Sequence, residues 1–290
     1  MFESDGISLS FPESVVPEND DSTLFVCSGM QDFKSRFSHP DGGRLGTVQP
    51  CVRTTDIDLV GDGSHLTSFD MVGNFSFGNN DYPDSVRLWH EILTRLAIPV
   101  THVTCAPERG DHRQLWERLG YTVQLDPECI WSDGNIGGNC CEVFVGTLEI
   151  GNLVNTLGHS TDVGFGIERL VQIREERSRV DETSLFPQDR TSLVRDHVRT
   201  LERLHQSGVT PGYKHRGWVC RRMLRRLFRE GEPLPEDLVI GEWLRTEREL
   251  QESNLRRARS TWRRHRNKPP EWWYASFGIP LEEYPLIAEP

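Results

Sequence analysis

The hydrophobic pattern of this 290-residue chain changes once, near residue 185, and the change limits the folds that it can adopt. Before that point, short apolar runs suited to β-strands are interspersed with a few helical patterns. In residues 65–77 (HLTSFDMVGNFSF), Phe75 and Phe77 alternate as core-facing strand residues do. Beyond it, apolar residues recur at helical spacing and glycine ends the segments. The sequence predicts an α+β body in residues 1–185, with a mainly antiparallel sheet, and a helical domain in residues 186–290.

Composition excludes several classes of protein. The chain is 36% hydrophobic and 27% charged, as globular domains are, and no apolar run approaches the ~18 residues of a membrane span. The first residues (MFESDGISLSF) carry neither a basic leader nor an apolar signal core. Seven cysteines at irregular spacings do not indicate a disulfide framework. We therefore expect a cytoplasmic protein with no membrane partner.

Charge is unevenly distributed along the chain. The net charge is -11, but residues 214–268 hold 16 Lys and Arg against 8 Asp and Glu, a net charge of +8, so the remainder carries -19. A basic segment of this kind can bind a polyanion such as RNA. It can equally form the solvated faces of amphipathic helices that dock on an acidic domain. The sequence leaves an RNA partner open.

Three motifs in a fixed order carry a family resemblance. They are CSGMQDFKSRF (Cys27–Phe37), the segment Cys51–Gly78 with GNFSFG at its end, and Leu148–Leu170 with TDVGFGIERL at its end. Together, with weaker similarity over residues 23–282, they resemble the catalytic core of alanyl-tRNA synthetases, which are class II aminoacyl-tRNA synthetases. The resemblance implies an ATP-dependent ligase with a mostly antiparallel sheet flanked by helices, followed by a helical domain.

The resemblance also implies which residues bind ATP. To form an aminoacyl adenylate, a carboxylate attacks the α-phosphate of ATP and pyrophosphate leaves, and guanidinium groups and Mg²⁺ neutralise the developing charge. Arg53 matches the family's arginine on the α-phosphate and Arg169 the one on the γ-phosphate, so these are the implied catalytic residues. Phe69 matches the aromatic residue that stacks on adenine, with Asp70 and Met71 at the purine edge.

For the amino acid, the resemblance implies a small pocket. Asp162 matches the aspartate that binds the α-ammonium through a charge-assisted pair, and Gly164, two residues later in the third motif, is assigned to the same amino-acid site. Trp131 matches the tryptophan that closes the pocket, and Val154 the valine that limits its size. Alanine is the implied substrate, although such pockets separate it from glycine or serine by only ~1–3 kcal/mol. From the residues alone, the aspartate could form a turn and the tryptophan could belong to the core.

Metal binding is expected to involve magnesium and not zinc. The resemblance implies that Glu149 holds Mg²⁺ and that Asn152 binds Mg²⁺ or the amino-acid carboxylate. Cys140 and Cys141 are adjacent, which makes it difficult for them to share one tetrahedral ion, and the chain has no C-x-x-C or H-x-x-x-H pair.

The departures from the family concern tRNA. Between Arg53 and Gly61 the family has a loop that is about four residues longer than the one in this chain. A lysine of that loop contacts ATP, and the loop itself lies near the acceptor end of tRNA. At the two positions that read the wobble pair of alanine tRNA, this chain has Tyr213 and Ala275, which cannot replace hydrogen bonding to base edges. The family's editing and C-terminal domains have no counterpart in the sequence.

Three functions remain open at this stage. The first is activation of alanine and its transfer to a small molecule, a nucleoside-like compound or a carrier protein, without canonical tRNA recognition. The second is a minimal alanyl-tRNA synthetase that charges tRNA or an unusual RNA. The third is a non-catalytic paralogue that binds an amino acid, a nucleotide or a partner. The oligomeric state is also open.

Overall fold

The computed structural model describes residues 6–18, 20–132, 134–234 and 238–288, and the chain divides after Gly208 into two compact units, residues 1–208 and 209–290. Unit 1 includes helix α5 (Ser192–Gln206), which the hydrophobic pattern alone assigns to the second domain. Unit 1 holds α5 through polar contacts: Asp196 Oδ1 on α5 accepts a 2.7 Å hydrogen bond from the backbone N–H of Thr67.

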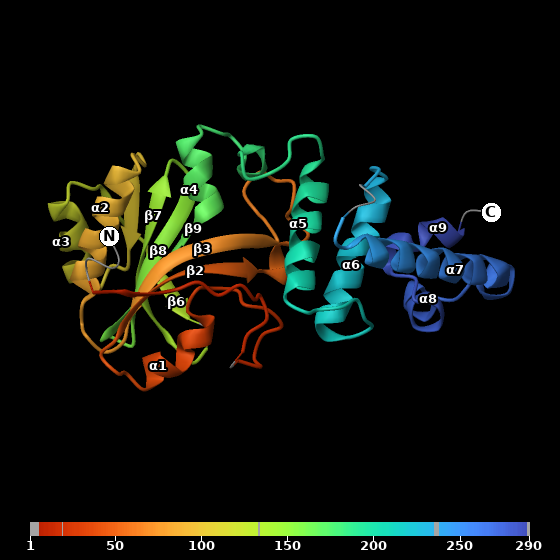
Figure 1. The fold of residues 1–290 in the computed structure, drawn as a ribbon, viewed down its shortest axis with the longest axis horizontal. Coiled ribbons are helices and arrows are strands. Elements are labelled where there is room, and N and C mark those ends of the chain that lie inside the picture. The colour runs from red at the N-terminus through yellow and green to blue at the C-terminus, as the bar shows by residue number, and fades with distance from the viewer. Residues whose placement is uncertain (1–5, 19, 133, 235–237, 289–290) are drawn as a thin grey trace. The chain divides into compact units, whose positions relative to one another are not determined.

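Unit 1 is built on one mixed sheet, in which the described residues form nine strands (Figure 1). The strand order is β1-β2-β3-β9-β8-β7-β4-β5, and β6 pairs with β7. Only the pairs β1·β2 and β4·β5 are parallel, which confirms the predicted mostly antiparallel sheet. The strands are β1 Ser8–Ser10, β2 Arg44–Val52, β3 Ser68–Ser76, β4 His102–Cys105, β5 Val123–Leu125, β6 Ile130–Ser132, β7 Gly137–Val145, β8 Leu148–Thr156 and β9 Ser160–Gly166.

Three helices cover one face of this sheet. They are α2 (Tyr82–Arg95), α3 (Gly110–Arg118) and α4 (Ile167–Arg174). Their apolar residues form one core with the side chains that β4, β7, β8 and β9 direct to this face. Trp89 on α2 stacks on Phe165 of β9 at 4.0 Å between ring centroids and donates a 2.7 Å hydrogen bond to Asn74 Oδ1. This packing leaves the opposite face of the sheet to a different set of elements.

The opposite face carries a smaller aromatic cluster under α1 (Lys34–Ser38) (Figure 1). Phe75 of β3 and Phe77, which directly follows β3, are fully buried there with Phe37 and Met30, which confirms that these alternating aromatic residues belong to the core. Trp131 of β6 packs against the cluster at its edge. Short 3₁₀ helices complete unit 1: Gln31–Phe33, Thr54–Asp56 and Val180–Glu182.

Unit 2 is helical, as its apolar periodicity predicts. Its helices are α6 (His215–Glu230), α7 (Gly241–His265), α8 (Pro270–Phe277) and α9 (Pro285–Ala288), with a 3₁₀ turn at Leu281–Glu283. Arg221 and Arg225 of α6 donate 2.7 and 2.9 Å hydrogen bonds to the buried Glu247 of α7. Some of the arginines of the basic segment therefore join α6 to α7 and do not face solvent. None of the helices described in either unit is long and apolar enough to cross a membrane.

Candidate active site

A cavity of about 760 Å³ lies on the face of the sheet opposite α2 and α3, and we call it the sheet pocket. Its walls come from β3, β7, β8, β9, the start of α4 and the segment before α1. Eight of the eleven predicted site residues line it: Arg53, Phe69, Met71, Trp131, Glu149, Asn152, Gly164 and Arg169. Residues from three separate motifs thus share one cavity of a size that suits a cofactor or substrate.

One side of the sheet pocket is cationic. Arg53 lies over the ring of Phe69 at 4.9 Å and donates a 3.1 Å hydrogen bond to the carbonyl of Cys27. Arg169 donates a 2.6 Å hydrogen bond to the backbone carbonyl of Glu149. Burial lowers the pKa of the Arg169 guanidinium, and the nearby charge of Arg53 lowers it further although Glu149 opposes both. Arginine stays charged despite such a shift, so the two guanidinium groups concentrate positive potential in this part of the cavity.

A third cation lines the same cavity, and the prediction from the sequence missed it. The Lys34 ammonium lies 2.6 Å from the carboxylate of Asp20. Burial alone would raise the pKa of Asp20, but hydrogen bonds from Lys34 and Ser22 outweigh it and lower that pKa to about 2. The ion pair therefore forms at neutral pH and holds the lysine at the pocket wall. Its place in the CSGMQDFK motif was the available signal.

The sheet pocket also has an anionic side, which adjoins the cationic one at Glu149, whose Oε2 lies 3.9 Å from Arg169 Nη1. Glu142 of β7 and Glu149 of β8 both line it, and Asn152 is the cross-strand neighbour of Glu142. Burial raises the pKa of Glu142, and the charges of Glu149 and Asp126 raise it further. Because one cavity is lined by both arginines and carboxylates, the sheet pocket suits a ligand with both anionic and cationic groups.

Asp162 and Val154 do not line the sheet pocket but lie beside it. Asp162 of β9 is 9% exposed, and its cross-strand neighbours are Val154 on β8 and Phe75 on β3. Trp131 packs against both the cluster that contains Val154 and the cluster that contains Phe75. Three of the residues that the resemblance assigns to the amino acid, Asp162, Val154 and Trp131, thus lie in one region of the sheet.

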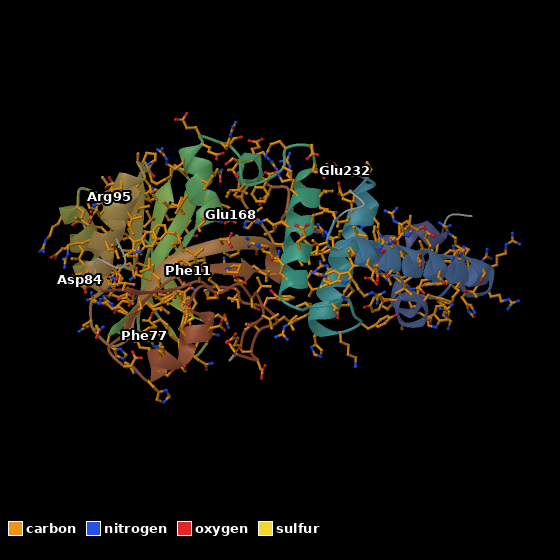
Figure 2. The ribbon with its side chains drawn as sticks, viewed as in Figure 1. Phe11, Phe77, Asp84, Arg95, Glu168 and Glu232 are labelled. Atoms are coloured by element: carbon orange, nitrogen blue, oxygen red, sulfur yellow. The ribbon has the colours of Figure 1, made fainter. Side chains whose placement is uncertain are left out.

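Asp70, the third predicted residue outside the cavity lining, is engaged by α5. Its Oδ2 accepts hydrogen bonds from Arg203 at 2.6 Å and from Arg199 at 3.1 Å. Its backbone N–H donates to the carboxylate of Glu168, which lies near the start of α4 (Figure 2). Burial raises the pKa of Glu168, and the Arg199 charge opposes that rise. This network positions β3, and with it Phe69 and Met71, at the pocket wall.

The adjacent cysteines do not act as a pair. Cys141 points into the helix-covered core, where its sulfur lies 2.6 Å from that of Cys105. Cys140 points to the other face and lies with Cys129 and Glu142. The sequence predicted no zinc from the adjacency of Cys140 and Cys141 and from the lack of C-x-x-C and H-x-x-x-H pairs, and neither pattern describes this group of residues that are distant in sequence.

Comparison with known proteins identifies the sequence relatives of this chain. A family model described as tRNA synthetases class II (A) matches residues 2–157. An alanine–tRNA ligase of Desulfitobacterium hafniense (strain Y51) is 29% identical over 79% of this chain and 34% of its own length. One from Treponema denticola is 29% identical over 82% of this chain and 52% of its own length. The chain thus spans about a third to a half of these relatives.

Two solved structures are similar at lower identity. The pyrrolysyl-tRNA synthetase from Desulfitobacterium hafniense has 13% sequence identity and a TM-score of 0.41, over 63% of this chain and 68% of that chain. An aspartyl-tRNA synthetase from Entamoeba histolytica has 14% identity and a TM-score of 0.43, over 66% and 56% respectively.

Proposed function

The chain belongs to the class II (A) tRNA synthetases, and from this premise we propose that it is a ligase that activates L-alanine with ATP as alanyl adenylate. The observation that carries the proposal is the sheet pocket, a single cavity lined both by the guanidinium groups of Arg53 and Arg169 and by the carboxylates of Glu142 and Glu149. Adenylate formation needs this polarity, because the phosphates and the α-ammonium of the two substrates carry opposite charges.

In this proposal ATP occupies the cationic side. Phe69, already stacked with Arg53, offers its ring to adenine, and Arg53 and Arg169 neutralise charge on the phosphates. Lys34 is a further cation on the same wall, which partly offsets the missing loop lysine. Glu149 supplies a carboxylate for Mg²⁺, which proteins commonly bind through one or two carboxylates plus substrate phosphates. When bound, the ion neutralises the leaving pyrophosphate.

Alanine would lie where the anionic side meets Trp131. The carboxylate of Asp162 is the candidate partner for the α-ammonium, and Val154 and Trp131 restrict the space for its side chain. Gly164 supports this assignment, because a Cβ there would lie 2.7 Å from the sulfur of Met71 and so narrow the cavity. A site of this kind favours the smallest amino acids.

We propose that the acceptor is not the canonical alanine tRNA but a small molecule, a nucleoside-like compound or a carrier protein. Tyr213 and Ala275 stand where the family has its wobble-pair readers, and neither side chain can reproduce their hydrogen bonds. The amine, hydroxyl or thiol of the acceptor would attack the alanyl carbonyl and release AMP.

A second candidate is transfer of alanine to an RNA, and one feature of unit 2 favours it. A cavity of about 690 Å³ is lined by Tyr213, Ala275, Trp218 and several arginines. Arg221 lies over the ring of Tyr213 at 4.3 Å, and Tyr213 is 75% exposed. Exposed aromatic rings between guanidinium groups can stack on unpaired bases.

The first test is amino-acid-dependent exchange of pyrophosphate with ATP, run with each of the twenty amino acids and without RNA. We expect exchange with alanine, and loss of that exchange in Asp162→Ala with ATP binding retained. Asp84→Asn, an exposed carboxylate on α2, is the matched control and should exchange normally. Addition of tRNA or candidate acceptors then identifies the transfer step.

The possible outcomes separate the candidates. No exchange with any amino acid, from folded protein that binds ATP, would overturn activation and leave a non-catalytic binding protein. Exchange followed by salt-sensitive alanylation of an RNA would favour the second candidate over the first. Exchange with unchanged rate in Asp162→Ala would leave activation standing and remove Asp162 from the site.

A further inference from the structure

The hairpin formed by β6 and β7 brings two distant cysteines together. Ile130 pairs with Asn139 in this hairpin, and one step farther the backbone N–H of Cys140 donates a 3.0 Å hydrogen bond to the carbonyl of Cys129. Directly opposed residues of an antiparallel pair direct their side chains to the same face, with Cβ atoms about 4.5–5.5 Å apart. The register of the hairpin therefore fixes Cys129 and Cys140 as a facing thiol pair.

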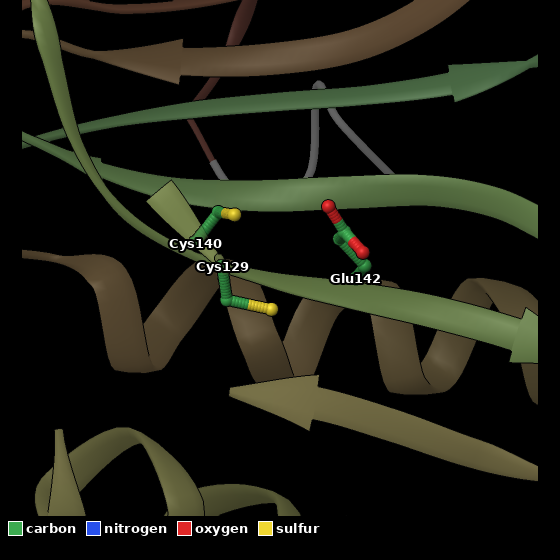
Figure 3. A group of neighbouring side chains, drawn as sticks. All are labelled: Cys129, Cys140 and Glu142. Atoms are coloured by element: carbon green, nitrogen blue, oxygen red, sulfur yellow. The ribbon is translucent and has the colours of Figure 1, made fainter. Parts of the chain in front are cut away.

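A carboxylate joins this pair because of the strand period. Glu142 lies two residues after Cys140 on β7, so both side chains share one face, whereas Cys141 between them points into the core. Figure 3 shows both cysteine sulfurs directed to the side on which Glu142 lies. The ligand atoms of Cys129, Cys140 and Glu142, which we call the cysteine–glutamate cluster, all lie within 4.8 Å of one another.

The cysteine–glutamate cluster has one polar neighbour, Thr104, whose hydroxyl accepts a 2.9 Å hydrogen bond from the Cys129 thiol and donates a 3.4 Å hydrogen bond to the Glu142 carboxylate. Cys129 and Cys140 are 1% and 2% exposed in an apolar environment that includes Val154. Glu142 is half-buried and lines the sheet pocket. A facing thiol pair next to a carboxylate is a donor set that a thiophilic divalent cation prefers.

We propose that Cys129, Cys140 and Glu142 bind one Zn²⁺ ion whose fourth coordination position opens to the sheet pocket. Binding releases the two thiol protons, and the three anionic ligands leave the site with one negative charge. In a tetrahedral site with Zn–S bonds of about 2.3 Å the sulfur atoms are about 3.8 Å apart, and the ligand atoms here, all within 4.8 Å of one another, are close enough to reach that spacing by small side-chain movements. Zinc sites with three protein ligands and one open coordination position are typical of catalytic sites, whereas structural sites have four protein ligands.

The position of the cysteine–glutamate cluster determines which molecules could reach the ion. Cys140 is the cross-strand neighbour of Val154, and Glu142 of Asn152, so the ion would lie at the edge of the sheet pocket. Water, or an amine, hydroxyl or thiol of the pocket's ligand, would take the fourth position. Only coordination by an amino acid rests on the proposed function, because zinc binding itself needs neither ATP nor catalysis.

Metal content of the purified protein tests the proposal. We expect one zinc per chain by elemental analysis of full-length protein expressed with zinc and purified without chelators. Replacement by Co²⁺ should produce the charge-transfer absorption of two thiolate ligands together with tetrahedral ligand-field bands. Cys129→Ser and Cys140→Ser should each lose the zinc and that absorption, while Glu142→Gln should bind it at least about tenfold more weakly.

Two controls keep the result independent of folding and of activity. Cys141→Ala changes the neighbouring residue on the opposite face, and Cys220→Ser changes a buried thiol of unit 2; both should retain one zinc. Wild-type protein that is folded and reduced yet binds neither Zn²⁺ nor Co²⁺ would overturn the proposal. A disulfide between Cys129 and Cys140 that forms in preference to metal binding would also overturn it. Failure of pyrophosphate exchange would leave both metal measurements unaffected.

Discussion

Replacement of Asp70 by asparagine tests whether this residue positions the pocket or binds ATP directly. The resemblance assigns Asp70 to the purine edge, whereas its carboxylate accepts hydrogen bonds from Arg203 and Arg199 of α5. Asp70→Asn keeps the size of the side chain and one carbonyl acceptor but removes the charge. If the carboxylate acts by joining β3 to α5, the substitution should loosen that junction before it changes nucleotide binding.

The contacts set the size of the effect. Hydrogen bonds to charged groups contribute about 1.5–3 kcal/mol each when they are well buried. Here the side chains are 25%, 18% and 20% exposed for Asp70, Arg203 and Arg199, which reduces that contribution through solvent screening. The asparagine oxygen retains part of one bond, and Glu168 still neutralises Arg199. We therefore expect a destabilisation of about 2 kcal/mol, or about a 30-fold shift in the local opening equilibrium.

Hydrogen exchange followed by mass spectrometry measures this effect in unit 1 alone. Peptides from β3 (residues 68–76) and α5 (residues 192–206) should exchange about 30-fold faster in Asp70→Asn, while unit 2 peptides should be unchanged. A double-mutant cycle with Arg203→Met should give a coupling energy of at least about 1 kcal/mol. Asp84→Asn, whose side chain is 53% exposed, serves as the control and should change exchange little.

One pattern of results would contradict a positioning role for Asp70. If Asp70→Asn exchanged like the wild type in β3 and α5 while its affinity for ATP fell tenfold or more, the carboxylate would be a direct nucleotide ligand. The ion pairs with α5 would then have to open when ATP binds. A coupling energy near zero with Arg203 would also contradict a positioning role.

Two further perturbations probe the sheet and the pocket wall. Gly73→Ala should unfold unit 1, because the new Cβ would lie 1.7 Å from a backbone oxygen of β9, and circular dichroism should show the loss of structure. Gly164→Ala should still fold, because the new Cβ would meet the flexible side chain of Met71, which can move. It should bind alanine more weakly in calorimetric titration, because the cavity is narrower. Asp20 has a folded pKa of about 2 against 3.8 unfolded, so its contribution to stability is complete above pH 3.8 and is lost as pH falls towards 2. Asp20→Asn, which weakens the contact with Lys34, should flatten this acid dependence in urea titrations at graded pH, and an unchanged acid limb would contradict the ion pair.

Much of the fold was predictable because local patterns and tertiary packing agree. The alternation of Phe75 and Phe77 predicted a strand with a buried face, and both side chains are fully buried at the end of β3. The helical spacing after residue 185 predicted helices, and α5 to α9 follow. The division between units was not predictable in this way, because α5 and α6 are both amphipathic helices, and long-range contacts such as those of Asp196 with Thr67 and of Arg203 with Asp70 are what attach α5 to unit 1.

The candidate site was predictable only where a motif carried it. Arg53, Phe69 and Arg169 come from conspicuous motifs, and all three line one cavity. Arg199 and Arg203 were missed because nothing local marks them: they are two of many arginines on helices, and their partner Asp70 lies about 130 residues earlier in the chain. Long-range ion pairs of this kind follow from strand and helix placement, which single-sequence patterns do not contain.

The proximity of Cys129 and Cys140 is another feature that the sequence alone did not predict. In the sequence, Cys140 and Cys141 are the closest pair, and their adjacency argued against a shared metal ion. On a strand, adjacency separates two side chains, since successive residues point to opposite faces, and the relevant neighbour of Cys140 is the residue across the hairpin. That residue, Cys129, is identified only once the β6–β7 register is known, and the same period then selects Glu142 rather than Cys141 as the third ligand. In a sheet, the sequence separation between metal ligands therefore depends on the strand register. A search for motifs of helices and tight turns, such as C-x-x-C or H-x-x-x-H, does not detect such a site.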